Sequence, residues 1–296
     1  MKPHILKVAL VQQACSSNKE ASLQETIRGI EEAADYGAKL VLLQELHTGL
    51  YFCQTENMDT FNLAEAIPGP TTELLGKLAK EHDLVIVGSL FERRAAGMYH
   101  NTAVVLDRDG SLVGRYRKMH IPDDPGFYEK YYFTPGDLGF TPIQTSIGKL
   151  GVLVCWDQWF PEAARIMALA GADLLLYPTA IGWFPQDAQE MKDKMVDSWV
   201  TIQRSHSIAN ALPVLSCNRV GFEPDPSGAS DGIQFWGNSF ITGVDGAILQ
   251  QANRNNFEVL VADLDLQQTE NQRRMWPHFR DRRIDAYGDL LKRIVD

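Results

Sequence analysis

Three residues of different chemistry each follow an apolar run: Glu45 after LVLLQ, Lys118 after SLVGRYR and Cys155 after LGVLV. A thiol is a nucleophile, a carboxylate can act as a general base, and an ammonium group stabilises a developing oxyanion. Each residue alone has an ordinary explanation, as a core cysteine, a surface acid or part of a solvated basic cluster. Together they form a set for acyl transfer and favour a catalytic function.

Cys155 lies where a strand is expected to give way to a helix. Residues 150–154 form the apolar run, and Pro161 suits the first turn of a helix that continues to Ala170. Free backbone N–H groups at such a turn favour a thiolate over a thiol and can hold an oxyanion. The turn alone leaves the buried structural interpretation open. The remaining cysteines, Cys15, Cys53 and Cys217, are interpreted as structural.

The surroundings of Glu45 and Lys118 suggest roles for both. Glu45 is followed by Leu46, Tyr51 and Phe52, and apolar neighbours raise the pKa of a carboxyl group, which suits a base near neutral pH. Lys118 leads into a long aromatic loop punctuated by prolines, and such loops inside compact domains are often functional. No histidine is assigned a catalytic role.

The elements that must position these residues alternate along the chain. Apolar runs predict strands at 5–11, 40–43, 84–87, 150–154, 174–177, 214–217 and 259–264. Helical spacing predicts helices before Gly37, after Pro70, at 161–170 and at about 188–211. Asp109-Gly110 and Asp245-Gly246 predict hairpins. The alternation indicates an α/β layered fold with mixed sheets, in one domain spanning 1–296.

Composition limits the partners. The formal net charge of −10 argues against a nucleic-acid surface, and no apolar stretch approaches the roughly 18–20 residues that cross a bilayer. The first residues lack the pattern of a signal peptide, and the four cysteines form no CxxC pair, so a reducing cytoplasm is expected. No metal cluster or phosphate-binding glycine loop is found, so no metal and no cofactor is predicted.

The C-terminal segment differs from the rest of the chain. Residues 267–296 are basic and carry Trp276, Phe279 and Tyr287. A solvated tail is the ordinary interpretation of such a charge run. The aromatic side chains favour instead an arm that packs on a neighbouring subunit of a homo-oligomer.

Three motifs carry a resemblance to a known family. LLQE around Glu45, GRYRKMHIPDD around Lys118 and GVLVCWDQWFPEAAR around Cys155 resemble the signatures of the nitrilase, or carbon–nitrogen hydrolase, superfamily. The similarity extends from about Ile5 to Tyr287. It implies a four-layer αββα sandwich, a homo-oligomer, and a catalytic set of Glu45, Lys118 and Cys155. It also implies a second glutamate after the lysine, for which Glu129 is the best match.

Within the superfamily, CWDQWFPEAAR, IPDDPGFYEKYYF and TAIGWFPQD resemble the N-carbamoylputrescine amidases. The resemblance implies a small carbamoyl-amine substrate, with the oxyanion held by Lys118 and the N–H of Trp156. Asp187 or Glu190 is expected to bind the substrate ammonium, although acids are also common in the first turn of a helix. Trp156 and Trp183 are expected to line the pocket, or else to be core residues.

Two alternatives stay open at this point. The first is hydrolysis of another C–N bond, in an aliphatic amide, a β-ureido acid or a nitrile. A carboxylate-tailed substrate would call for an arginine such as Arg219 or one from the C-terminal segment. The second alternative is a scaffold that has kept the fold without the chemistry, and the intact set of Glu45, Lys118 and Cys155 argues against it.

Overall fold

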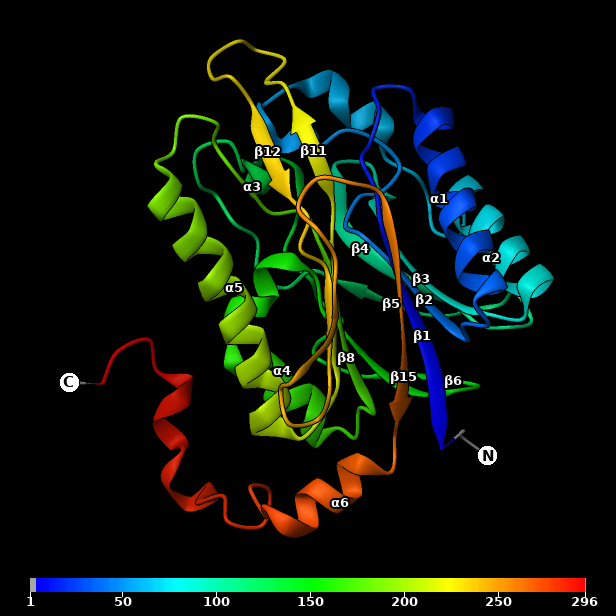
Figure 1. The fold of residues 1–296 in the computed structure, drawn as a ribbon. Helices are drawn as coiled ribbons and strands as arrows, with labels where there is room; N and C mark the ends of the chain where they lie inside the picture. Colours follow the sequence, from blue (N-terminus) through cyan, green and yellow to red (C-terminus); the bar gives the residue numbers. More distant parts are fainter. Residues whose placement is uncertain (1–3, 296) are drawn as a thin grey trace.

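The computed structural model describes residues 4–295 and contains two six-stranded sheets (Figure 1). The first sheet has the strand order β15-β1-β2-β3-β4-β5. Its strands are β1 (Ile5–Gln12), β2 (Leu40–Leu43), β3 (Val85–Ala95), β4 (Met98–Leu106), β5 (Leu112–Arg117) and β15 (Glu258–Asp265). Strands β1, β2 and β3 are parallel. β15 pairs antiparallel with β1, β4 pairs antiparallel with β3, and β5 pairs antiparallel with β4.

The second sheet repeats this plan with the order β14-β13-β10-β8-β7-β6. Its strands are β6 (Ile143–Thr145), β7 (Gly148–Val152), β8 (Leu174–Thr179), β10 (Val214–Asn218), β13 (Phe240–Thr242) and β14 (Ile248–Gln251). Here β7, β8 and β10 are the parallel strands. A smaller sheet contains β9 (Gly182–Trp183), β11 (Val220–Glu223) and β12 (Ile233–Trp236).

Helices cover the outer faces of the two large sheets. Helices α1 (Lys19–Asp35) and α2 (Pro70–His82) lie on one side of the molecule, and α4 (Pro161–Leu169) and α5 (Gln189–Asn210) lie on the other (Figure 1). Along β1, Val8 faces the core shared with the second sheet, while Val11 packs toward α1 and α2. This arrangement confirms the predicted αββα sandwich.

Local sequence explains where several elements begin and end. The Asn18 side chain accepts a hydrogen bond from the Ala21 N–H and caps α1, and Pro70 and Pro161 occupy first-turn positions where no N–H is needed. Gly110 has a φ of +88° in the predicted hairpin, a conformation that favours glycine. All of β2 is buried, as expected of a strand enclosed between helices and a second sheet.

The carboxyl ends of the parallel strands meet across the two sheets. The Glu45 N–H, just beyond β2, donates a hydrogen bond of 3.4 Å to the carbonyl of Thr179 at the end of β8. Residues that follow β2, β7, β8 and β10 therefore share one end of the sandwich. Ligand sites of α/β sheets are characteristically found beyond such strand ends.

The chain finishes on α6 (Gln268–Met275), followed by two short 3₁₀ turns, Ile284–Ala286 and Gly288–Leu291. Figure 1 shows this segment running along the bottom of the molecule and then away from it. None of the described helices has the length and hydropathy of a membrane span.

Candidate active site

Cys155 opens a 3₁₀ turn, Cys155–Trp159, shortly after β7 ends at Val152. The expected strand-to-helix turn is present, but this 3₁₀ turn separates the cysteine from α4. Cys155 has a φ of +45°, a strained value for a residue with a side chain, and such strain collects at functional sites. Its Sγ lies 3.8 Å from the carbonyl oxygen of Ala180, just beyond β8.

Glu45, Lys118 and Glu129 form a buried ion network. The Lys118 Nζ donates to Glu45 Oε1 at 2.9 Å and to Glu129 Oε2 at 2.6 Å. All three side chains are at most 1% exposed. Glu45 follows β2, Lys118 follows β5, and Glu129 begins the short helix α3 (Glu129–Tyr132), so the fold brings together residues far apart in sequence.

The network fixes the charge of the lysine. Burial alone lowers the pKa of Lys118, but the carboxylates of Glu129 and Glu45 outweigh it and raise the pKa well above its ordinary value. Burial also raises the pKa of Glu129, to about 7, with a further contribution from Glu45 against the opposing effect of Lys118. Lys118 is therefore an ammonium at neutral pH, and Glu129 titrates there.

The cysteine itself corrects one expectation. Burial raises the pKa of the Cys155 thiol well above its ordinary value, and Glu45 and Glu129 add to this against the effect of Lys118. The strand-end N–H groups therefore do not make Cys155 a resting thiolate. A reaction at this thiol would need a base, and Oε2 of Glu45 is buried and accepts no hydrogen bond from the described residues.

Three further side chains hold this network, and the sequence did not indicate that any of them belongs to it. The Asn101 Nδ2 donates to Glu45 Oε1 at 2.6 Å, and the Tyr51 hydroxyl donates to Glu129 Oε1 at 2.7 Å. The Arg219 Nη2 donates to the backbone carbonyls of Glu45 at 3.0 Å and Leu46 at 2.9 Å. Asn101 lies in β4, so only the pairing of β4 with its neighbours brings it to Glu45.

Asp157 connects the turn that begins at Cys155 to the loop that carries Lys118. Its fully buried carboxylate accepts hydrogen bonds from the Val154 N–H at 2.9 Å and the Tyr116 hydroxyl at 2.8 Å. It also accepts from the His120 N–H at 3.0 Å and from the His120 Nδ1 at 2.7 Å. Segments that follow β5 and β7 are thereby joined through one side chain.

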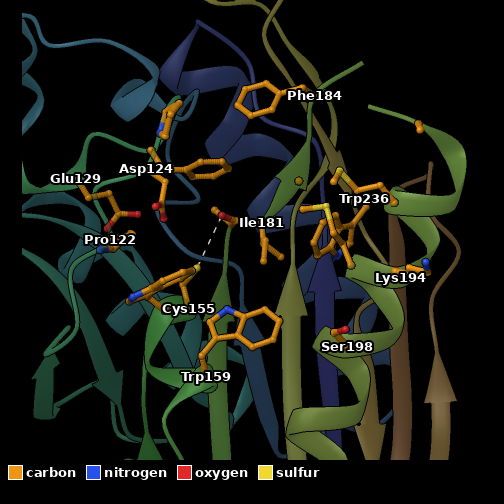
Figure 2. A pocket seen from close by; sticks show the side chains of 18 of the residues that line it. Pro122, Asp124, Glu129, Cys155, Trp159, Ile181, Phe184, Lys194, Ser198 and Trp236 are labelled. Carbon is orange, nitrogen blue, oxygen red and sulfur yellow. Dashed lines mark hydrogen bonds between the residues drawn. The ribbon is translucent and has the colours of Figure 1, made fainter. Parts of the chain in front are cut away.

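A cavity of about 830 Å³ opens beside Cys155 and Glu129 (Figure 2). Its aromatic lining consists of Phe127, Trp156, Trp159, Phe184 and Trp236. Its charged lining consists of Asp124, Glu129, Glu190 and Lys194. No arginine is found in the lining formed by the described residues, and Arg219 is fully buried and ion-paired with Glu223. The structure therefore does not place Arg219 where a substrate carboxylate would bind.

Only some of the residues predicted to bind substrate line the cavity. Trp156 and Glu190 line the cavity, whereas Trp183 and Asp187 are not among its lining residues. The Asp187 carboxylate instead accepts a hydrogen bond from the Phe184 N–H at 3.0 Å and closes the turn before α5. The Trp183 ring packs on Trp236, with 5.3 Å between ring centroids.

The described residues contain no group of three or more histidine, cysteine or acidic side chains that could hold a metal ion. Each cysteine of the described chain is free, as Cys15, Cys53, Cys155 and Cys217 form no disulfide.

Comparison with known proteins bears on this geometry. A family model described as carbon–nitrogen hydrolase matches residues 7–274. The chain belongs to the carbon–nitrogen hydrolase family. Membership identifies it as an amidohydrolase and agrees with the superfamily that the three motifs indicated.

Relatives within the carbon–nitrogen hydrolase family cover nearly the whole chain. An N-carbamoylputrescine amidase from Oryza sativa subsp. japonica is 44% identical, across 97% of this chain and 94% of its own. A citrullinase from Francisella tularensis is 42% identical, across 97% of this chain and 99% of its own. The crystal structure of a carbon–nitrogen hydrolase from Helicobacter pylori G27 superposes with a TM-score of 0.96 at 52% identity, covering 99% of this chain and 100% of that one.

Proposed function

We propose that this carbon–nitrogen hydrolase cleaves N-carbamoylputrescine to putrescine, ammonia and carbon dioxide. The observation that carries the proposal is the cavity beside Cys155, whose walls are aromatic and whose charged lining has three carboxylates and one lysine but no arginine among the described residues. Apolar walls suit a four-carbon chain, and surplus carboxylates suit an ammonium tail. The N-carbamoylputrescine amidases among the relatives support this choice of substrate.

In the proposed mechanism each group of the catalytic set has its own role in the first half of the reaction. Glu45 takes the thiol proton through its free Oε2 while the Cys155 sulfur bonds to the ureido carbon. The Lys118 ammonium and the N–H of Trp156 stabilise the tetrahedral oxyanion. Glu45 then passes the proton to the leaving ammonia as the C–N bond breaks, which leaves a thiocarbamate on Cys155.

Water completes the cycle with the same groups. Glu45 takes a proton from a water molecule, whose oxygen bonds to the thiocarbamate carbon, and the C–S bond then breaks. The proton returns to the sulfur, and the released carbamic acid loses carbon dioxide to give putrescine. Glu129 accepts hydrogen bonds from the Lys118 ammonium and from the Tyr51 hydroxyl, and so fixes the position of the ammonium.

A second candidate substrate is citrulline, which carries the same ureido group on a chain that ends in an α-amino acid. Lys194 lines the cavity and supplies a cation that could meet the α-carboxylate. Its Nζ lies 2.6 Å from Glu190 Oε1, so this cation already has an anionic partner. The cavity therefore favours N-carbamoylputrescine.

The test is ammonia release from N-carbamoylputrescine, citrulline and N-carbamoyl-β-alanine, each supplied separately to the wild-type enzyme and to Cys155→Ala. We expect the highest kcat/KM for N-carbamoylputrescine and no turnover by the variant. A higher kcat/KM for citrulline would establish the second candidate. Turnover that persists in Cys155→Ala would contradict the assignment of the nucleophile.

A further inference from the structure

The carboxylates that line the cavity differ in what already occupies them. Both oxygens of Glu129 accept hydrogen bonds, one from Tyr51 and one from Lys118. Glu190 is paired with Lys194 on the exposed surface of α5, where the two side chains are 80% and 74% exposed. Asp124 differs, because its carboxylate has no hydrogen-bond or ion-pair partner among the described residues.

The segment that carries Asp124 is held in place. The Phe127 N–H donates to the Asp124 carbonyl at 2.8 Å and closes a tight turn. Gly126 in that turn has a φ of +77°, and a Cβ there would lie 3.0 Å from the Phe184 ring. Phe127 packs on Tyr51 with 5.5 Å between ring centroids. The backbone that carries Asp124 is therefore anchored to the wall of the cavity.

The view of the cavity places this carboxylate relative to the nucleophile. Figure 2 shows Asp124 extending into the cavity on the side of Glu129, with Cys155 below it and Lys194 on the opposite side. The aromatic side chains Phe184, Trp159 and Trp236 line the same cavity and would enclose an alkyl chain (Figure 2).

We propose that Asp124 is the residue that selects for a cationic tail, by pairing with the terminal ammonium of the substrate while Cys155 attacks the ureido carbon. The inference rests on the proposed function and assigns the ammonium site to a residue other than Asp187 and Glu190. Asp187 accepts a hydrogen bond within the turn before α5, and Glu190 already has Lys194 as an ion-pair partner. A carboxylate without a protein partner can pair with a cation without breaking an existing ion pair or hydrogen bond of the chain.

The experiment compares a charged and an uncharged substrate of the same shape. N-carbamoylputrescine and N-pentylurea share the ureido group and the chain length, and they differ in ending with an ammonium or a methyl group. The variant is Asp124→Asn, and the matched control is Asp123→Asn: both aspartates are exposed, but Asp123 does not line the cavity. Glu190→Gln tests the competing assignment.

For Asp124→Asn we expect kcat/KM on N-carbamoylputrescine to fall about ten- to a hundredfold, the range of a hydrogen bond to a charged group. The loss should appear mainly as a higher KM, because the ammonium lies away from the reacting atoms. On N-pentylurea we expect a change of less than about threefold, and Asp123→Asn should leave both substrates unaffected.

Other results would overturn the inference in distinguishable ways. Equal losses on both substrates would mean that Asp124 only supports the fold of the loop. No loss on either substrate, or a selective loss in Glu190→Gln instead, would place the ammonium elsewhere while leaving the proposed function intact. Failure of the wild-type enzyme to hydrolyse N-carbamoylputrescine would overturn the proposed function, and this inference with it.

Discussion

At the scale of single residues, the buried site holds more negative charge than its one ammonium can balance. Lys118 meets two carboxylates, Glu45 and Glu129, while the Cys155 thiol keeps its proton because burial and the same carboxylates raise its pKa. Burying a second unbalanced carboxylate is costly, so one of the two is the natural place for a proton. The pKa of Glu129, raised to about 7, identifies it as that place.

This charge balance predicts the pH dependence of activity. Because the pKa of Glu129 is raised above its ordinary value to about 7, the group is mostly protonated at pH 6 and ionised at pH 8. Ionised Glu129 supports the ammonium of Lys118, so kcat/KM should rise with pH along an acid limb near 7, by roughly tenfold per unit below it. The substrate ammonium does not titrate in this range.

Glu129→Gln provides the check on that acid limb. The variant cannot ionise at position 129, so the limb near pH 7 should disappear and the remaining activity should be lower at pH 8. The measurement is kcat/KM from pH 5.5 to 9 for both enzymes. An unchanged acid limb in the variant would assign the titration to another group.

At the scale of elements, the site depends on how strand ends are joined. Asp157 links the segment after β7 with the segment after β5, so it holds Cys155 and Lys118 in one geometry. Asp157→Asn retains the shape of the side chain but replaces one accepting oxygen with a donor, which faces donors it cannot pair with. We expect the free energy of unfolding to fall by about 1–3 kcal/mol, the cost of buried groups left without partners.

The same substitution should reduce kcat because the turn that begins at Cys155 loses hydrogen bonds that fix its position. Urea unfolding measures the stability, and turnover at saturating substrate, under conditions where the variant is fully folded, measures the catalytic effect. Asp123→Asn is the exposed control and should change neither. Wild-type stability in Asp157→Asn would show that the hydrogen bonds to its carboxylate contribute nothing net.

The elements show what the sequence is able to predict. Apolar runs locate the parallel strands, and the order of residues alone shows that Glu45, Lys118 and Cys155 follow such runs. Asn101 cannot be found in this way, because it lies in a strand and meets Glu45 only through the pairing of β3 with β4 and the packing beyond it. Arg219 is visible in the sequence as a charge, but only the fold shows that its partners include backbone carbonyls.

The same limit applies to the cavity. A run of residues such as IPDDPGF contains two adjacent aspartates, and nothing in their order indicates which one faces the substrate. In three dimensions Asp124 lines the cavity and Asp123 does not. Asp187 is an equally reasonable candidate from sequence, and its hydrogen bond within the turn before α5 is a local contact that depends on how the chain folds there.

At the scale of the whole molecule, the C-terminal segment is the part least accounted for by one chain. Trp276 is 56% exposed and Leu291 is 96% exposed, whereas Phe279 packs against Arg165 and Arg273 of its own chain. The beginning of the segment is thus attached to the body, and the apolar side chains beyond it are left uncovered (Figure 1). The segment is basic while the chain carries a formal net charge of −10.

We therefore expect residues 283–296 to pack on a second copy, because their exposed apolar side chains gain from burial. Removing them should lower the mass measured by sedimentation at micromolar concentration, while the circular dichroism spectrum stays that of the intact fold. Leu291→Ser should have a smaller effect in the same direction. A full-length protein that sediments as a monomer at every concentration would show that the arm serves no contact between copies.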